Sequence, residues 1–386
     1  MREAMDWFLT EPSRRKTQRE GRYNPDVFSY SCPDGSGRFV IDSRNDSIYL
    51  LDRREDVKIE VLTDRSSIIG EVIDGFGSRL VGFELTFPNG RTHRFDLLSV
   101  MAAHTPAYVG NQSEIYALTQ TICPNGQKVD YSYDTSATHD GIAFSEQLRS
   151  IIPGTNTRID GDMGIGDNPA RSSTALNLIR CVGKEVTLSR IKTANYEMNF
   201  ITSGREDLPG VKKLDRIYVK ALHTAQPADT CCRDFRFSYD YFVSPNASNY
   251  FTKHFSNFSA IRQEAHMLKR LKLNSVCAVA DGKEEERYRF FYDTQLLPRK
   301  DSYAVDYWGY YNGETLNESF VPDPYYLMWG NLEGYAPIKN LPAENNTIMK
   351  RSLRAYDFES SKACILTGVQ YPTGGYSEIT YEPHRF

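Results

Sequence analysis

Hydrophobic and polar residues alternate along most of the chain from Val27 onward. The stretches "VGFELTFPNGRTHRFDLL" and "TICPNGQKVDYSYD" each place an Asn-Gly pair, Asn89-Gly90 and Asn125-Gly126, between two alternating runs. A period of two is typical of a strand with one buried face, and Asn-Gly between such strands is a strong hairpin signal. The pattern therefore predicts antiparallel hairpins over most of the sequence.

Each strand that follows an Asn-Gly turn separates two kinds of side chain. After the first turn, His93 and Phe95 share one face with Leu97, whereas Arg94 and its polar neighbours take the other. After the second turn, the apolar face is predicted to consist of Val129, Tyr131 and Tyr133, opposite Lys128, Asp130 and Ser132. These strands are expected to be half buried, as in a sheet that covers a core on one side.

Helical periodicity is rare in the sequence. The best candidate is "FSAIRQEAHMLKRLKL" at 258–273, although its tail alternates and a strand beginning near Arg270 competes with the helix end. We therefore predict an all-β protein with large antiparallel hairpin-rich sheets, sandwich-like, and one or two short helices. A two-sheet sandwich and a partly closed barrel or propeller both fit short strands with frequent turns.

The sequence also suggests how the chain is divided. Residues 1–24 form a polar N-terminal arm, 25–250 a first antiparallel β region, and 251–386 a second one with a Tyr/Trp-rich loop at 303–337. The two β regions can equally form one continuous assembly. A loop as long as 303–337 is expected to be functional or locally folded.

Charge and hydropathy narrow the classes of function. The formal net charge of −4 and the pI near 6.0 give no electrostatic reason to expect nucleic acid as a partner. No run approaches the roughly 18 apolar residues that cross a bilayer, so no membrane span is predicted. The start "MREAMDWFLT" lacks the features of a secretion signal, so either the protein is cytoplasmic or a leader has been removed.

Local motifs for catalysis are missing from the sequence. The histidines never occur as His-x-x-x-His, and neither a Gly-x-Ser-x-Gly elbow nor a phosphate-binding Gly-x-x-x-x-Gly-Lys is present. We therefore predict a protein that is not an enzyme and that needs no organic cofactor. A groove lined by carboxylates and aromatic rings would instead indicate a glycan-cleaving enzyme.

A Gly-rich acidic stretch, "DGDMGIGDN", is the one candidate for metal binding. Its carboxylate and amide oxygens are ligands that calcium prefers, but the bidentate Glu that closes a twelve-residue calcium loop is missing. A plain surface loop is the competing interpretation. The predicted calcium ligands are Asp160, Asp162, Asp167 and Asn168.

Aromatic residues gather in the 303–337 segment, interleaved with Gly, Asn and Asp. Flat rings with polar tips can stack on sugar faces or form a protein hot spot, and they can equally cap the end of a β core. The candidate ligand-binding residues are Tyr307, Trp308, Tyr310, Tyr311, Tyr325, Tyr326 and Trp329.

Four segments end alike, in "YSYD" at 131–134, "FSYD" at 237–240, "FFYD" at 290–293 and "ITYE" at 379–382. With the turns "PNG" and "PTGG", and the phrases "DYWGYYNG" and "YPTGG", the chain resembles the region upstream of the repeats in secreted bacterial Rhs/YD-repeat proteins. The endings are irregularly spaced, so the chain is not itself a regular repeat array.

The resemblance implies a structural role, because Rhs-type proteins form large β shells that enclose and deliver a C-terminal effector. It places no catalytic residue in this region. We expect a non-enzymatic scaffolding module of a secreted or surface-exposed bacterial protein, with its leader removed. Its expected partner is a downstream YD-repeat shell of the same polypeptide. The alternative is a glycan-binding or adhesion module that contacts a glycan or a cell-surface protein through the Tyr/Trp-rich segment.

Overall fold

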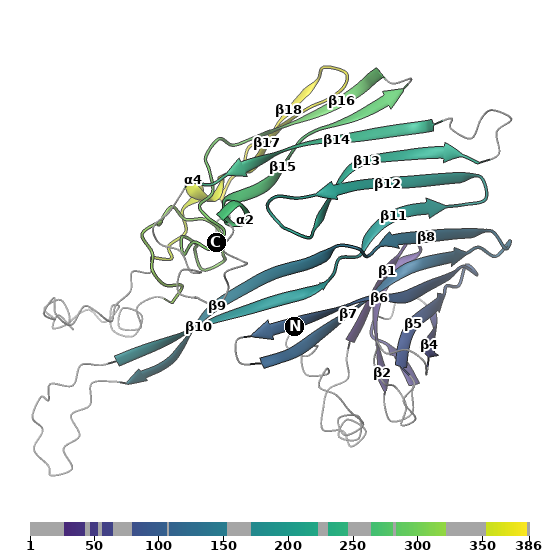
Figure 1. Cartoon of the computed structure of the whole chain (residues 1–386), viewed down its shortest axis with the longest axis horizontal. Coiled ribbons are helices and arrows are strands. Elements are labelled where there is room, and N and C mark those ends of the chain that lie inside the picture. Colours follow the sequence, from purple (N-terminus) through teal and green to yellow (C-terminus); the bar gives the residue numbers. More distant parts are fainter. Residues whose placement is uncertain are drawn as a thin grey trace, which may run out of the picture. The chain divides into compact units, whose positions relative to one another are not determined.

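The computed structural model of the chain is mostly β, with antiparallel sheets and two short helices among the residues it describes (Figure 1). This confirms the predicted fold class. The structure describes residues 27–42, 47–52, 56–64, 79–105, 108–152, 171–222, 231–245, 264–280, 283–321 and 353–383. The predicted N-terminal arm at 1–24 lies outside these ranges.

The chain divides into two compact units, each assembled from three stretches of sequence. Unit 1 comprises Met1–Ile142, Ile179–Phe237 and Cys277–Glu286, and unit 2 comprises the remaining stretches. Five strands contribute residues to both units. They are β9 (Thr138–Ile152), β10 (Arg171–Lys184), β14 (Cys231–Val243), β15 (Lys269–Ala280) and β16 (Lys283–Tyr292).

Unit 1 contains a three-stranded sheet of order β1-β2-β3 and a longer antiparallel run of order β4-β5-β6-β7-β8-β11-β12-β13. The far end of β6 also pairs with β10. The strands of the small sheet are β1 (Val27–Cys32), β2 (Gly35–Asp42) and β3 (Ser47–Leu50). Those of the longer run are β4 (Lys58–Asp64), β5 (Arg79–Thr86), β6 (Thr92–Thr105), β7 (Tyr108–Ile122), β8 (Lys128–Asp134), β11 (Thr187–Lys192), β12 (Tyr196–Gly204) and β13 (Lys212–Ala221).

An aromatic core joins the two sheets of unit 1 in the manner of a sandwich. The ring of Phe28 stacks on Phe39 in the small sheet, with centroids 5.1 Å apart, and both rings meet Phe83 of β5 edge-on. Such pairs add to the hydrophobic gain from burial. The buried members of this core are Phe39, Val57, Leu80, Phe83, Leu85, Phe87 and Phe95.

The predicted faces hold in β6, where His93 and Phe95 are buried while Arg94 is exposed. In β8 Lys128 and Asp130 are exposed as predicted, but Ser132 is half-buried like Tyr131 and Tyr133. Both Asn-Gly turns are present as well, with β6 pairing β5 and β8 pairing β7 in antiparallel register. Alternation and turn chemistry together therefore set the register of these hairpins.

Unit 2 ends in the antiparallel order β16-β17-β18, where β17 spans Leu366–Gln370 and β18 spans Tyr376–Glu378. Its helices are α2 (Glu264–Leu268) and α4 (Phe358–Ser361). The helix predicted over 258–273 is therefore shorter at its C-terminal side, because β15 begins at Lys269, close to the competing strand start near Arg270. Cross-strand pairing outweighs helix propensity in the alternating tail.

The part of the Tyr/Trp-rich segment that the structure describes, residues 303–321, has no regular strand apart from an isolated antiparallel bridge between Val305 and Tyr311. It is nevertheless packed locally, because Tyr303 and Ala304 are buried apolar side chains of unit 2. The predicted division of the chain at residue 250 stays a prediction.

Candidate functional site

A tight turn at Asp306–Tyr310 presents the aromatic residues that the sequence singled out. The backbone N–H of Asp306 donates to the carbonyl of Tyr310 (2.8 Å), and the N–H of Gly309 donates to the carbonyl of Asp306 (3.2 Å). Gly309 has a φ of +96°, a left-handed conformation that glycine adopts without strain. The result is a five-residue hairpin turn that closes its own backbone hydrogen bonds.

The Asp306 carboxylate reinforces this turn from within. Asp306 is 0% exposed, and its Oδ1 accepts hydrogen bonds from the backbone N–H groups of Trp308 (2.8 Å) and Tyr310 (2.9 Å). The other oxygen, Oδ2, is buried and meets no hydrogen-bond donor among the described residues. The turn is therefore held through one carboxylate oxygen that satisfies two backbone donors.

The same five-residue turn occurs three more times in the described chain. In each case the first residue donates to the carbonyl of the fifth, and a glycine at the fourth position donates back to the first. The fourth-position glycines have φ values between +78° and +86°. The three turns are Phe87–Arg91, Cys123–Gln127 and Tyr371–Gly375, and each carries Pro at its second position and Asn or Thr at its third.

The half-buried side chain of Arg354 anchors the turn to the rest of unit 2. The guanidinium of Arg354 donates to the carbonyls of Asp306 and Phe320, and it lies 5.4 Å from the centroid of the Tyr307 ring. Burial lowers the pKa of Arg354, and nearby Tyr307 and Asp306 oppose this effect. The arrangement fixes the Tyr307 ring against a cation on its inner side.

Two buried asparagines hold the segment Leu353–Ala355, which includes Arg354. Asn312 donates through Nδ2 to the carbonyls of Leu353 (2.9 Å) and Ala355 (3.1 Å). Asn317 accepts from the N–H of Leu353 through Oδ1 (2.8 Å) and donates to its carbonyl through Nδ2 (2.8 Å). The side-chain amides of Asn312 and Asn317 thus pair with the backbone of this segment as a neighbouring strand would. They hold the segment in place beneath the turn.

The sequence-predicted binding residues separate into three groups. Tyr307, Trp308 and Tyr310 are 58%, 70% and 62% exposed, whereas Tyr311 is half-buried, where burial raises its pKa. The structure therefore brings three of the candidates together on one turn and places a fourth below them. Tyr325, Tyr326 and Trp329 lie outside the described residues.

The predicted calcium ligands Asp160, Asp162, Asp167 and Asn168 also lie outside the described residues. Within the part of the chain that the structure describes, no group of three or more His, Cys, Asp or Glu side chains could hold a metal ion. The calcium site therefore stays a prediction. None of the helices in the described ranges is long and apolar enough to cross a membrane.

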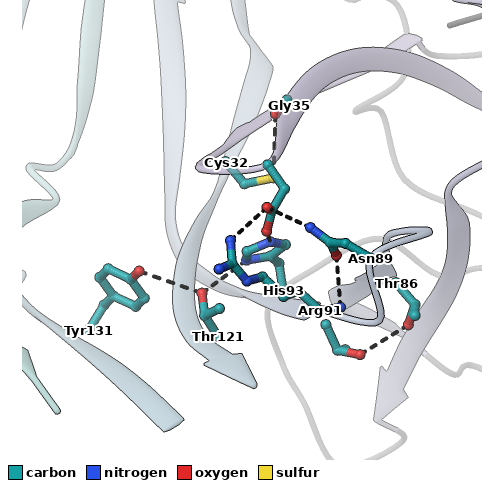
Figure 2. A network of polar contacts seen from close by, with 10 residues as sticks. Cys32, Gly35, Thr86, Asn89, Arg91, His93, Thr121 and Tyr131 are labelled. Atoms are coloured by element: carbon teal, nitrogen blue, oxygen red, sulfur yellow. Dashed lines mark hydrogen bonds and ion pairs between the residues drawn. The ribbon is translucent and has the colours of Figure 1, made fainter. Parts of the chain in front are cut away.

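A second polar site, which the sequence did not predict, is buried in unit 1 (Figure 2). His93 is 0% exposed, and its Nε2 lies 2.6 Å from Oδ2 of Asp34 while its Nδ1 lies 2.9 Å from the Thr121 hydroxyl. Asn89 and Arg91 donate to the other oxygen of Asp34, at 2.8 Å and 2.9 Å. Both oxygens of the carboxylate are therefore fully used.

This network joins three hairpins of unit 1. Asp34 belongs to the turn between β1 and β2, Asn89 and Arg91 to the turn between β5 and β6, and Thr121 lies on β7. Figure 2 shows the side chains of Asn89, Arg91 and His93 converging on one point from the turn and strand that carry them. The contacts fix the small sheet on the longer one through charge-assisted hydrogen bonds.

The order carboxylate, imidazole, hydroxyl has the connectivity of a nucleophilic triad. Thr121 is only 5% exposed and its hydroxyl lies 3.5 Å from that of Tyr131, so it is enclosed by protein in this structure. A nucleophile must reach a substrate carbonyl, and a hydroxyl shielded in this way cannot. The arrangement functions as a buried clamp between hairpins.

The clamp changes the acidity of its carboxylate. Burial by itself raises the pKa of Asp34, but hydrogen bonds from His93, Asn89 and Arg91 outweigh burial and lower the pKa below its ordinary value. The same ion pair with Asp34 raises the pKa of Arg91. Asp34 is therefore ionised in the folded protein at neutral pH.

Three of the four recurring Tyr-Asp and Tyr-Glu endings share a structural role. The hydroxyls of Tyr133, Tyr292 and Tyr381 donate to the backbone carbonyls of Leu118 (2.7 Å), Leu273 (2.8 Å) and Leu366 (2.8 Å). In two cases the acid that follows then caps the strand end. Asp134 accepts from the N–H of Ser136, and Asp293 accepts from the N–H of Gln295.

No family model matches the chain, and no curated protein matches it. Among solved structures, the complexes TcdB2-TccC3-Cdc42 and TcdB2-TccC3-TEV match at 8% identity and a TM-score of 0.31, over 70% of this chain. The chain spans 12% of the length of the matched chain in both. A TM-score at this level assigns no family.

Proposed function

We propose that the chain is a non-enzymatic structural module of a secreted or surface-exposed bacterial Rhs-like protein. The observation that carries this proposal is the use of the reactive side chains. The half-buried Asp34 and the buried His93 and Thr121 hold hairpins together, and the Tyr-Asp endings donate to neighbouring strands and cap strand ends. The resemblance of the strand endings to Rhs-type proteins supports the same role.

The absence of enzymatic activity can be tested directly. We expect no release of reducing ends when the purified chain is incubated with β-1,3-glucan, chitin, cellulose and peptidoglycan. Asp34→Asn and His93→Gln serve as matched variants, since they remove a carboxylate-imidazole pair that the structure brings together. Turnover in the native chain that either substitution abolishes, with folding intact, would overturn the proposal.

The location and the partner need a separate test. In cells that express the natural gene product, surface biotinylation and fractionation of the medium should recover the protein outside the cytoplasm. Cross-linking mass spectrometry on that product should then join this region to a YD-repeat segment of the same polypeptide. Recovery from the cytosol alone, or cross-links to unrelated proteins only, would contradict this part of the proposal.

A further inference from the structure

The Asp306 turn differs from its three counterparts in the residues at its tip. The other turns carry Pro followed by Asn or Thr at the second and third positions, and both kinds of residue favour the turn by themselves. The Asp306 turn has Tyr307 and Trp308 at these positions instead. Since the same backbone closes without aromatic residues elsewhere in the chain, the turn itself does not require them.

The rings at the tip are not explained by packing either. Trp308 and Tyr310 are 70% and 62% exposed, and among the described residues Arg354 lies against the ring of Tyr307. An exposed Tyr or Trp ring leaves more apolar surface in water than an Asn or a Pro at the same position, and this costs free energy. A small group of exposed rings on a rigid base is typical of a binding surface.

The hydrogen bonds beneath the tip reduce the conformational entropy that is lost on binding. Asp306 Oδ1 holds the N–H groups of Trp308 and Tyr310, and Arg354 ties the carbonyl of Asp306 to that of Phe320. The backbone of the tip is therefore ordered before a ligand arrives. Pre-organisation of this kind increases affinity, because less conformational entropy is lost on binding.

The chemistry of the tip favours a carbohydrate over a protein or a nucleic acid. The tip has no exposed charge, since Asp306 is buried and Arg354 is engaged below the ring of Tyr307. It offers apolar ring faces together with phenol and indole hydrogen-bonding groups, which suit the C–H faces and hydroxyls of a sugar. A stable protein interface needs about 800 Å² from each partner, and three partly exposed aromatic side chains of about 150–250 Å² each fall short of that area.

We infer that the turn formed by Tyr307, Trp308, Gly309 and Tyr310 is a binding site for a neutral carbohydrate. The rings of Trp308 and Tyr310 stack on pyranose faces, and Tyr307 is held in place by Arg354. This activity is independent of the structural role proposed above, because it concerns the exposed tip and not the strands below it.

The chain supplies its own matched variant for the test. The double substitution Tyr307→Pro and Trp308→Asn rewrites the tip as the Pro-Asn-Gly turn found at 88–90 and 124–126, so that the hairpin is kept and two rings are removed. Tyr196→Ala controls for general loss of aromatic surface, since Tyr196 is 54% exposed in a different turn. Thermal melts of all three proteins check that they are folded.

Binding is measured with the full chain on a microarray of neutral oligosaccharides from cellulose, chitin, β-1,3-glucan and mannan. The strongest signal is confirmed by fluorescence titration with that oligosaccharide. We expect the double variant to bind at least tenfold more weakly than the native chain and Tyr196→Ala to bind like it. An array without signal, or equal binding by the folded double variant, overturns the inference. A blank array with capture of a protein partner would place the tip in a protein interface instead.

Discussion

Asp34 is a single carboxylate on which the mutual position of two sheets of unit 1 depends. Three donors from a different hairpin meet its two oxygens, and the ring of His93 continues the chain of hydrogen bonds to Thr121. Removal of Asp34 leaves the fully buried His93 imidazole without its partner, and this is costlier than the loss of an exposed ion pair.

We expect Asp34→Ala to lower the free energy of unfolding by about 2–4 kcal/mol, as measured by urea denaturation. The matched control is Asp52→Ala. Asp52 also pairs with an arginine, Arg38, but on the surface, and its loss should cost less than about 1 kcal/mol. Equal costs for the two substitutions would show that the buried network adds nothing to stability.

The lowered pKa of Asp34 gives this contribution a defined pH dependence. A carboxyl whose pKa is lower in the folded than in the unfolded chain stabilises the fold above the unfolded pKa, near 4. That stabilisation is lost as the pH falls through the folded value. The difference in unfolding free energy between native protein and Asp34→Asn should therefore be constant from pH 7 to about 5 and shrink below about pH 4. A difference that grows on acidification contradicts the assignment.

At the scale of the element, the strand ends follow one scheme that is repeated without a fixed period. Tyr133, Tyr292 and Tyr381 each donate to the carbonyl of a leucine on an upstream segment. Burial raises the pKa of both Tyr133 and Tyr292, as expected for hydroxyls removed from water. The tyrosine of these Tyr-Asp and Tyr-Glu endings therefore hydrogen-bonds the end of one segment to the backbone of its neighbour.

Substitution of these tyrosines by phenylalanine isolates the hydroxyl. We expect Tyr133→Phe and Tyr292→Phe to cost about 1 kcal/mol each in urea unfolding, and the two costs to add, since the sites share no partner. Tyr196→Phe, at an exposed turn, should change stability by less than about 0.5 kcal/mol. A neutral effect at all three positions would rule out a structural role for the hydroxyls.

A substitution at Gly82 of β5 tests how closely β5 and β6 approach each other. A Cβ atom there would collide with the backbone carbonyl oxygen of Phe95 on β6, which cannot move without disturbing the sheet. We expect Gly82→Ala to destabilise the fold by about 2–3 kcal/mol, as seen in thermal or urea unfolding. Gly204→Ala, where nothing lies within 4 Å of the new Cβ, should be close to neutral. A larger loss of stability for Gly204→Ala than for Gly82→Ala would contradict the observed strand spacing.

The sequence could predict those elements whose signals are local. Asn89-Gly90 and Asn125-Gly126 announce their turns, and alternation places His93 and Phe95 on the buried face. The aromatic density over 303–337 included Tyr307, Trp308 and Tyr310 among its candidates, and these three are exposed. The clamp could not be predicted, because Asp34 and His93 are far apart in sequence and meet only through the packing of two hairpins. The role of Arg354 could not be predicted either, because its partners are the backbone carbonyls of distant residues, and these carry no sequence signal.

At the scale of the whole molecule, the division into units does not follow the order of the sequence. Unit 1 includes Cys277–Glu286, and five strands contribute residues to both units. Domains that fold alone are usually separated by linkers that few contacts cross. The chain instead alternates between its units inside strands.

This interleaving predicts the behaviour of fragments. Residues 25–250 and 251–386, the two regions that composition and pattern suggest, should each fail to show a cooperative unfolding transition when expressed alone. Near-UV circular dichroism and urea titration of each fragment, with the whole chain as control, provide the measurement. A fragment that unfolds cooperatively with the stability of the whole chain would establish an independent domain.

The self-contained turn at Asp306–Tyr310 also has a consequence for how such a protein can change. Its backbone hydrogen bonds and the Asp306 carboxylate involve no side chain at positions 307 and 308. Position 308 can therefore change with little penalty to folding, whereas Tyr307 also lies against Arg354. The binding preference inferred for the tip can then diverge between descendants while the sheets stay the same. For the same reason, Trp308→Cys offers an attachment point for a fluorophore or a peptide tag.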